Sequence, residues 1–402
     1  MGRWCLGAGL TVLAGCHTAD DVVAGGDAGT GRPSALGSTA ARASTASPLV
    51  IEIEDLLEQA VADRVFPGAV CLIRQDGVDL CRLAVGRETY ADDARAVEVE
   101  HLFDMASLTK VCATTPVVLR LVARGTLTLE TRVADLLPFF AGEGKGAVTI
   151  RHLLTHSSGL PAWRKFYEQG LVGKAAVVRA AAGEPLEARP GERTRYSDLG
   201  LILLMACVEQ AAGADFDAVV QREVFDPLGM PSARFNTTGR GLPWCVPTEV
   251  SQFHGKLLDG VVHDENAFVM GGASGHAGLF AAADDVARLA EAFLRGGTDE
   301  GGDPWLPQAL VANATRRQNL TANSSRCLGW DSPRAGSWAG AAVPEGLFAH
   351  TGFTGTSVWC DPATATCVVL LTNRVHPTRK EKRHTAVRRR LHDLVQRHLA
   401  GR

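Results

Sequence analysis

The segment FDMASLTKVCATT, residues 103–115, places a serine and a lysine three positions apart where an apolar helix begins. On a helix that starts at Ser107, residues three apart share a face, so the Lys110 amine can approach the Ser107 hydroxyl. A serine hydroxyl is a poor nucleophile until a base removes its proton, and a lysine is such a base when burial or a nearby cation keeps it partly neutral. The pair is a candidate nucleophile and base, but this spacing also arises by chance and needs support.

The composition indicates a globular protein with a small substrate. The chain has 402 residues, of which 46% are hydrophobic, enough for a large core in one domain or in two closely joined ones. The formal net charge is only −3, without the basic excess that nucleic-acid binding requires. We therefore expect a small-molecule substrate and no nucleic-acid partner, and we take the protein to be a monomer.

The first residues indicate export. Arg3 precedes an apolar run that ends in small residues, and LAGC at 13–16 resembles a bacterial lipobox, in which Cys16 becomes the lipid-bearing first residue. Residues 1–15 are thus predicted to be a signal peptide, and a soluble secreted protein cut nearby is the alternative. Residues 16–48 have no aromatic residue and are rich in small and polar ones, so we expect a flexible tether on a lipid-anchored protein of the cell envelope.

The ten cysteines suit an oxidising compartment. Cys71 and Cys81 flank an Asp-Gly turn, and a three-residue loop at 75–77 would place them opposite each other. Cys360 and Cys367 flank DPATAT in a similar way. Each pair is either a disulfide or two buried thiols, because a register shift of one residue separates the sulfur atoms.

Hydrophobic periodicity predicts an α/β (α+β) protein. Residues 49–64 show helical spacing, and residues 67–86 indicate two antiparallel strands around a turn. Helical signals follow to about residue 270, at 107–124, 151–156, 171–182 and 199–212. Strand signals return at 277–282, 346–352, 355–361 and 366–374, before an amphipathic helix with apolar Val387, Leu391, Leu394, Val395 and Leu399. We expect one domain over residues 49–402, with a sheet part at 49–105 and 276–402 and an inserted helical part at 106–275.

Two further segments support the Ser107–Lys110 pair: RTRYSDLG at 193–200 and FAHTGFTGTS at 348–357. The order Ser-x-x-Lys, Tyr-x-Asn or a variant, then Lys-Thr-Gly or His-Thr-Gly before a strand resembles the serine β-lactamase and penicillin-binding-protein superfamily. Over about residues 50–400 the chain is similar to its class C and esterase branch, including the phrases IRHLLTHSSGLP, PLGM, GHAGLFAAADD and LLTNRVHPTR. The resemblance implies an antiparallel sheet flanked by helices, with an inserted helical region.

The resemblance also implies catalytic roles, and it implies no cofactor. Ser107 would be the acylated nucleophile and Lys110 its proton partner. Tyr196 would be a phenol or phenolate that relays protons to and from the leaving group. Asp198 would help to position the substrate.

The third box would bind the substrate backbone. The amides of Ser107 and Phe353, which follows His350, Thr351 and Gly352, would form the oxyanion hole. A glycine at 352 suits a substrate that lies close against the strand.

Two positions depart from the usual pattern and bear on the substrate. Asp198 replaces the asparagine usual in β-lactamases, and an ionised carboxylate cannot donate to a substrate carbonyl. His350 replaces a lysine, and because histidine is only partly charged near neutral pH, binding of a substrate carboxylate would weaken as pH rises. We therefore expect an esterase or a D-Ala-D-Ala-type peptidase, with a β-lactamase or an inactive binding protein of the same fold as alternatives.

Other candidate residues are assigned structural roles. Tyr90 begins a second Tyr-x-Asp but precedes Ser107, which is the wrong order. His152 and His156 could share a helix face, but no glutamate follows His152, so we expect no metal site. We interpret His276 as a hydrogen-bonded structural residue, and Asp264 and Glu265 as loop residues.

Overall fold

A five-stranded antiparallel sheet lies at the centre of the computed structural model, which describes residues 47–401. The strand order is β2 (Val78–Gly86), β1 (Gly68–Gln75), β10 (Thr366–Thr372), β9 (Ser357–Asp361) and β8 (Phe348–Thr351). The first two strands thus pair with the last three, and the prediction that the two ends of the domain share one sheet is confirmed. The predicted signal peptide and Cys16 lie outside the described residues.

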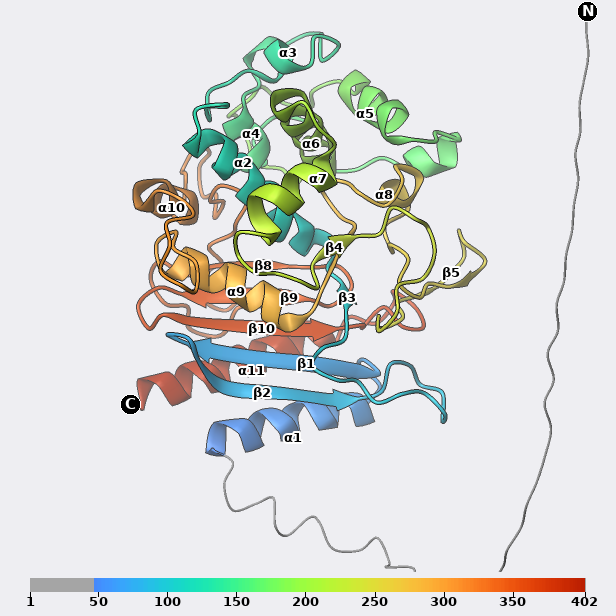
Figure 1. Ribbon diagram of the computed structural model, residues 1–402, viewed down its shortest axis with the longest axis vertical. Helices are drawn as coiled ribbons and strands as arrows, with labels where there is room; N and C mark the ends of the chain where they lie inside the picture. Colours follow the sequence, from blue (N-terminus) through green and yellow to red (C-terminus); the bar gives the residue numbers. More distant parts are fainter. Residues whose placement is uncertain (1–46, 402) are drawn as a thin grey trace, which may run out of the picture. The chain divides into compact units, whose positions relative to one another are not determined.

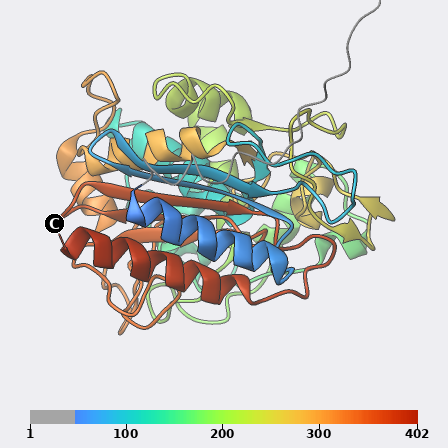
Figure 2. The ribbon, with the colours of Figure 1, turned by 90° about the horizontal axis from the view of Figure 1, so that it is seen from below.

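The two faces of the sheet carry separate cores. Successive side chains of a strand point to opposite faces, so Val70 and Leu72 of β1 join one hydrophobic cluster, whereas Ala69, Cys71 and Ile73 join another. Helices α1 (Pro48–Ala62) and α11 (His384–Ala400) lie side by side on the second face (Figure 2). Helix α9 (Ala283–Leu294) and the helical region cover the first face (Figure 1).

The helical region is built around α6 (Asp198–Ala212), in which every residue from Leu199 to Val208 is buried. The other helices on this side of the sheet are short: α2 (Thr115–Ala123), α3 (Val133–Leu136), α4 (Ile150–Leu154), α5 (Lys174–Gly183), α7 (Phe216–Val220), α8 (Glu265–Val269) and α10 (Gln308–Thr315). Turns of 3-10 helix at Lys145–Ala147 and Phe166–Gln169, and of π-helix at Gln221–Phe225, link them. Helix α6 is apolar on all sides because it is buried on all sides.

Two small sheets complete the fold. β7 (Leu279–Ala281), predicted as a strand, pairs with β3 (Phe103–Asp104) and β4 (Arg234–Phe235) and not with the central sheet. β5 (Val250–Ser251) and β6 (Lys256–Leu257) form a hairpin. The β3–β7 pairing anchors the chain immediately before residue 107.

The first hairpin differs from the prediction in its register. Its loop has two residues, Asp76 and Gly77, and a bulge after Ile73 places Cys81 opposite Ile73 and not opposite Cys71. The predicted three-residue loop is wrong, and with it the placement of Cys71 directly opposite Cys81, although the two side chains are still in contact. Cysteines 360 and 367 do lie directly opposite each other, yet all eight cysteines within residues 47–401 are free thiols.

Candidate active site

Ser107 lies on a short 3-10 turn, Ala106–Leu108, directly after β3. The residue before it, Ala106, has a φ of 45°, a left-handed conformation that costs a non-glycine residue roughly 1–2 kcal/mol. The buried Asp104 carboxylate stabilises this bend, since it accepts hydrogen bonds from the N–H groups of Ala106 at 2.8 Å and His263 at 2.7 Å. Backbone strain of this kind is concentrated at functional sites.

The predicted helix at 107–124 is present but composite. The 3-10 turn is followed by a π-helix at Lys110–Thr114 and then by α2. Pro116, the second residue of α2, has no N–H to donate to the carbonyl four residues before it, which explains why the chain widens into a π turn at this point. Lys110 is the first residue of that turn, and π turns occur frequently at functional sites.

The Lys110 side chain contacts other residues that the sequence predicted for the site. Its Nζ lies 3.0 Å from Ser107 Oγ, 2.9 Å from the carbonyl oxygen of His276 and 2.8 Å from Asp198 Oδ1. Nζ is also 4.9 Å from the centre of the Tyr196 ring. The first two sequence boxes therefore converge on one buried ammonium group.

The charge of Lys110 differs from the expectation. Complete burial lowers the pKa of a lysine, but the Asp198 charge and the contacts with Tyr196 outweigh it, and the pKa of Lys110 is raised above its ordinary value. The condition under which a lysine acts as the base, an amine kept partly neutral, is therefore not favoured by this arrangement. Lys110 is a cation that donates to Ser107 Oγ.

The ring of Tyr196 is held between cationic and aromatic groups. The His156 ring lies 4.4 Å from it, centre to centre, and His156 Nδ1 accepts a hydrogen bond from the Ser197 N–H at 3.1 Å. The guanidinium of Arg326 lies 5.2 Å from the ring centre. The sequence analysis placed neither residue beside Tyr196. His156 lies in the phrase IRHLLTHSSGLP, which could have indicated it, whereas no sequence signal indicated Arg326.

The segment after β8 packs directly against the nucleophile segment. Thr354 Oγ1 donates to the carbonyl of Asp104 at 2.7 Å, and Thr356 Oγ1 donates to the carbonyl of Met105 at 3.1 Å. A Cβ atom on Gly352 would lie 2.0 Å from Thr356 Oγ1 and 2.5 Å from the Met105 oxygen, so no side chain fits there. Gly352 is thus required by internal packing, a reason that the sequence did not suggest.

Two backbone donors are left free beside the nucleophile. Within residues 47–401, neither the Ser107 N–H nor the Phe353 N–H donates a hydrogen bond. Phe353 is 48% exposed, and its backbone follows the Gly352 turn. These are the two amides that the resemblance assigns to the oxyanion hole.

His350 is buried beside these groups. It is 4% exposed, its Nδ1 lies 3.0 Å from the Thr351 carbonyl oxygen, and its ring centre is 6.2 Å from that of Tyr196. Burial, and then the charges of Arg326 and Lys110, hold the pKa of His350 well below its ordinary value. The prediction that this imidazole is partly charged near neutral pH is therefore wrong.

A cavity of about 430 Å³ lies beside the residues that the three sequence boxes predicted for the site. Its walls carry residues of all three boxes and of the C-terminal helix: Ser107, Tyr196, Arg326, Asp331, Trp338, His350, Thr351, Gly352, Phe353, Arg374, His384, Thr385 and Arg388. Lys110, which is buried, and Asp198 are not among these wall residues.

The remaining candidates stay outside the cavity wall. His152 Nδ1 lies 2.9 Å from Thr149 Oγ1 at the start of α4, a cap and not a ligand. His276 pairs with Asp264 at 2.8 Å, and Glu265 pairs with Arg379 at 2.7 Å. The described residues contain no cluster of three potential metal ligands.

A serine hydrogen-bonded to a buried lysine, beside a tyrosine and two free backbone donors, is the arrangement expected of a serine hydrolase. The chain belongs to the beta-lactamase family, whose model matches residues 53–392.

Relatives and solved structures support this assignment. The chain is 30% identical to "N-acetylmuramyl-L-alanine amidase" of Bacillus subtilis, over 81% of each chain. It is 31% identical to "Putative D-alanyl-D-alanine carboxypeptidase" of Escherichia coli K12, over 77% of this chain and 79% of the relative.

Two solved structures share the fold. EstCE1, described as a hydrolase with promiscuous acyltransferase activity, matches with a TM-score of 0.68 and 23% identity, over 86% of this chain and 98% of the other. A penicillin-binding protein homologue from Caulobacter crescentus matches with a TM-score of 0.66 and 20% identity, over 87% and 98%. The fold is therefore β-lactamase/transpeptidase-like, as predicted.

Proposed function

We propose that this protein is an exported hydrolase that forms an acyl-enzyme on Ser107 and acts on esters or on D-Ala-D-Ala-type peptides. The observation that carries the proposal is the 3.0 Å hydrogen bond between Lys110 Nζ and Ser107 Oγ beside two unpaired backbone donors. The names of the amidase and carboxypeptidase relatives agree with acyl-transfer chemistry on cell-wall peptides.

The charge of Lys110 changes the role of each group. Because the lysine is protonated, a different group must take the Ser107 proton, and Tyr196 is in contact with Lys110 and faces the same cavity. Tyr196 would take this proton, in the relay role that the resemblance implies, beside the positive charges of Lys110 and Arg326. Ser107 Oγ then attacks the substrate carbonyl as its proton passes to the Tyr196 oxygen, and that proton passes on to the leaving group.

The oxyanion and the second half-reaction use the same groups. The N–H groups of Ser107 and Phe353 would hold the negative oxygen of the tetrahedral intermediate, a contribution of about 3 kcal/mol for one donor in comparable sites. Water then attacks the carbonyl carbon of the Ser107 ester and gives a proton to Tyr196. The bond from that carbon to Ser107 Oγ breaks, Ser107 Oγ takes the proton back from Tyr196, and the acid is released. Asp198 keeps Lys110 charged throughout.

The decisive experiment is active-site labelling with Ser107→Ala and Lys110→Ala variants. Wild type should be labelled by a fluorophosphonate, and both variants should lose nearly all label and ester turnover. Since the two groups act as a unit, the double variant should be no worse than either single one. Lys256→Ala, which removes an exposed lysine, is the matched control and should behave as wild type. Substantial ester hydrolysis by Ser107→Ala would contradict the proposal.

The same assay separates the alternatives. Rapid turnover of a fluorescent penicillin would favour a β-lactamase, which Asp198 makes less suited because it cannot donate to the substrate amide. Folded wild type that reacts with neither probe would favour an inactive binding protein. The convergence of all three boxes on one cavity supports an active enzyme.

We further propose that the protein is lipid-anchored through Cys16 at the cell envelope and is a monomer. The lipobox-like LAGC supports the anchor, and the cell-wall chemistry in the names of the relatives supports export. One structural relative is described as octameric, so size-exclusion chromatography with light scattering is the test of the monomer.

A further inference from the structure

The active-site cavity has an excess of positive charge. Three guanidinium groups line it, those of Arg326, Arg374 and Arg388, against the single carboxylate of Asp331. Its two histidines, His350 and His384, both have a pKa below the ordinary value because they are buried near arginines, and that of His384 is about 3. A cavity of this charge favours anionic substrates.

Two of the three arginines are bound to the protein itself. Arg374 Nε donates to the Phe353 carbonyl at 2.7 Å, and its Nη1 donates to two further backbone carbonyls. Arg388 Nη2 donates to the carbonyls of Gly355 and Thr356, at 3.1 and 3.2 Å. Arg388 Nε has no partner among the described residues, but the side chain is only 4% exposed. Both arginines therefore hold the turn that carries Phe353.

Arg326 is different. Within residues 47–401 its guanidinium makes no hydrogen bond and no ion pair, although its side chain is partly buried. Its backbone is fixed, because its carbonyl accepts from the Gln318 N–H at 2.9 Å and its N–H donates to Ser324 Oγ at 3.2 Å. The guanidinium thus lies over the Tyr196 ring and is available to a ligand.

We propose that Arg326 binds a carboxylate on the leaving group of the substrate. The inference rests on the proposed function, in which Tyr196 passes its proton to the leaving group, so a cation stacked on Tyr196 reaches that side of the scissile bond. A guanidinium pairs with a carboxylate through two parallel hydrogen bonds. The preferred substrates are then acyl-D-amino-acid esters or peptides with a free terminal carboxylate. Arg326 takes the part that the sequence assigned to His350.

The test compares two ester substrates that differ only in charge. They are an acyl-D-alanyl-D-lactate with a free carboxylate and the same compound capped as its methylamide, so esterase and peptidase specificity are probed alike. The proteins are wild type, Arg326→Met, Arg326→Lys and the control Arg334→Met, which removes an exposed arginine of the same loop.

Wild type should prefer the carboxylate substrate. Arg326→Met should lower the ratio of the two kcat/KM values by about tenfold to a hundredfold, mainly through KM, because one charge-assisted pair is lost. Arg326→Lys should restore part of the ratio, and Arg334→Met should leave it unchanged. The KM of wild type for the carboxylate substrate should stay flat from about pH 5.5 to 8, because arginine keeps its charge over this range.

Three results would overturn the inference. An equal loss on both substrates would mean that Arg326 only supports Tyr196. An unchanged ratio in Arg326→Met would mean that Arg374 or Arg388 binds the carboxylate, and a KM that rises with pH would return that role to His350. If wild type hydrolyses neither substrate and Ser107 takes no fluorophosphonate, the proposed function itself fails, and this inference fails with it.

Discussion

At the scale of single residues, the Asp198 carboxylate determines which chemistry Lys110 can perform. A completely buried lysine without a counter-ion would lose its proton readily, whereas the ion pair at 2.8 Å keeps it charged. A position that usually holds an amide in the β-lactamases thus holds the counter-ion of Lys110. The substitution that first suggested weak penicillin turnover has a second, electrostatic consequence.

We predict that Asp198→Asn shifts the alkaline limit of activity to lower pH. The carboxylate raises the pKa of Lys110, so the ammonium persists to high pH in wild type. Without it, burial lowers that pKa, and any step that needs the cation is lost at a lower pH. The measurement is kcat/KM for a neutral ester from about pH 6 to 10.5, with the exposed Asp135→Asn as control. Higher activity of Asp198→Asn at neutral pH would show that a neutral lysine is the base.

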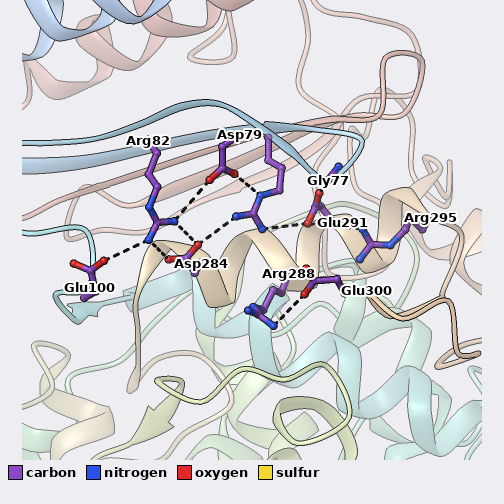
Figure 3. A network of polar contacts seen from close by, with 10 residues as sticks. Gly77, Asp79, Arg82, Glu100, Asp284, Arg288, Glu291, Arg295 and Glu300 are labelled. Carbon is purple, nitrogen blue, oxygen red and sulfur yellow. Dashed lines mark hydrogen bonds and ion pairs between the residues drawn. The ribbon is translucent and has the colours of Figure 1, made fainter. Parts of the chain in front are cut away.

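At the scale of elements, an ionic network joins the β1–β2 hairpin to α9 (Figure 3). Arg74 lies at its centre, 2.6 Å from Asp79 and 3.3 Å from each of Asp284 and Glu291. Glu291 also accepts from the Gly77 N–H at 3.0 Å and its side chain is 4% exposed. The network ties the hairpin turn to the helix that covers the sheet.

We predict that Arg74→Met lowers the free energy of unfolding by about 3 kcal/mol, because it removes the nearest cation from a buried carboxylate. Arg82→Met is the matched control: Arg82 pairs with Asp284 at 2.6 Å, but its side chain is 35% exposed, and its loss should cost at most about 1 kcal/mol. Urea unfolding of the full-length proteins measures both. Equal losses would show that burial of Glu291 does not set the cost.

At the scale of the whole molecule, the described fold begins where the predicted tether ends. Ser47 caps α1, and its side chain accepts a hydrogen bond from the Val50 N–H. A tether of the predicted length would let an enzyme of this size reach substrate away from its anchor.

We predict that the wild-type protein is recovered with membranes and that Cys16→Ser is released or stays unprocessed. Two or more acyl chains anchor far more firmly than one, so the partition should be nearly complete. Fractionation of fluorophosphonate-labelled cells, with N-terminal mass determination and Cys5→Ser as control, measures it. A wholly soluble wild type cleaved at another residue would exclude the anchor.

The sequence by itself determined the elements and the membership of the site. Residue periodicity placed the strands at both ends and the helices between them, and the three boxes named Ser107, Lys110 and Tyr196, which the fold does bring together. Secondary structure and sequence motifs depend on residues that are close together in the chain, so a short stretch of sequence is enough to predict them.

Only the tertiary structure decided the charge of the site. Burial lowers the pKa of His350, with Arg326 and Lys110 acting in the same direction, whereas the Asp198 charge outweighs burial and raises the pKa of Lys110. The proposed role of Arg326 rests on the absence of a partner among the described residues. Desolvation and Coulomb interactions act through space between groups remote in sequence, as in the 166-residue separation of Lys110 and the carbonyl of His276. The bulge that places Cys81 opposite Ile73 likewise followed from the pairing of whole strands.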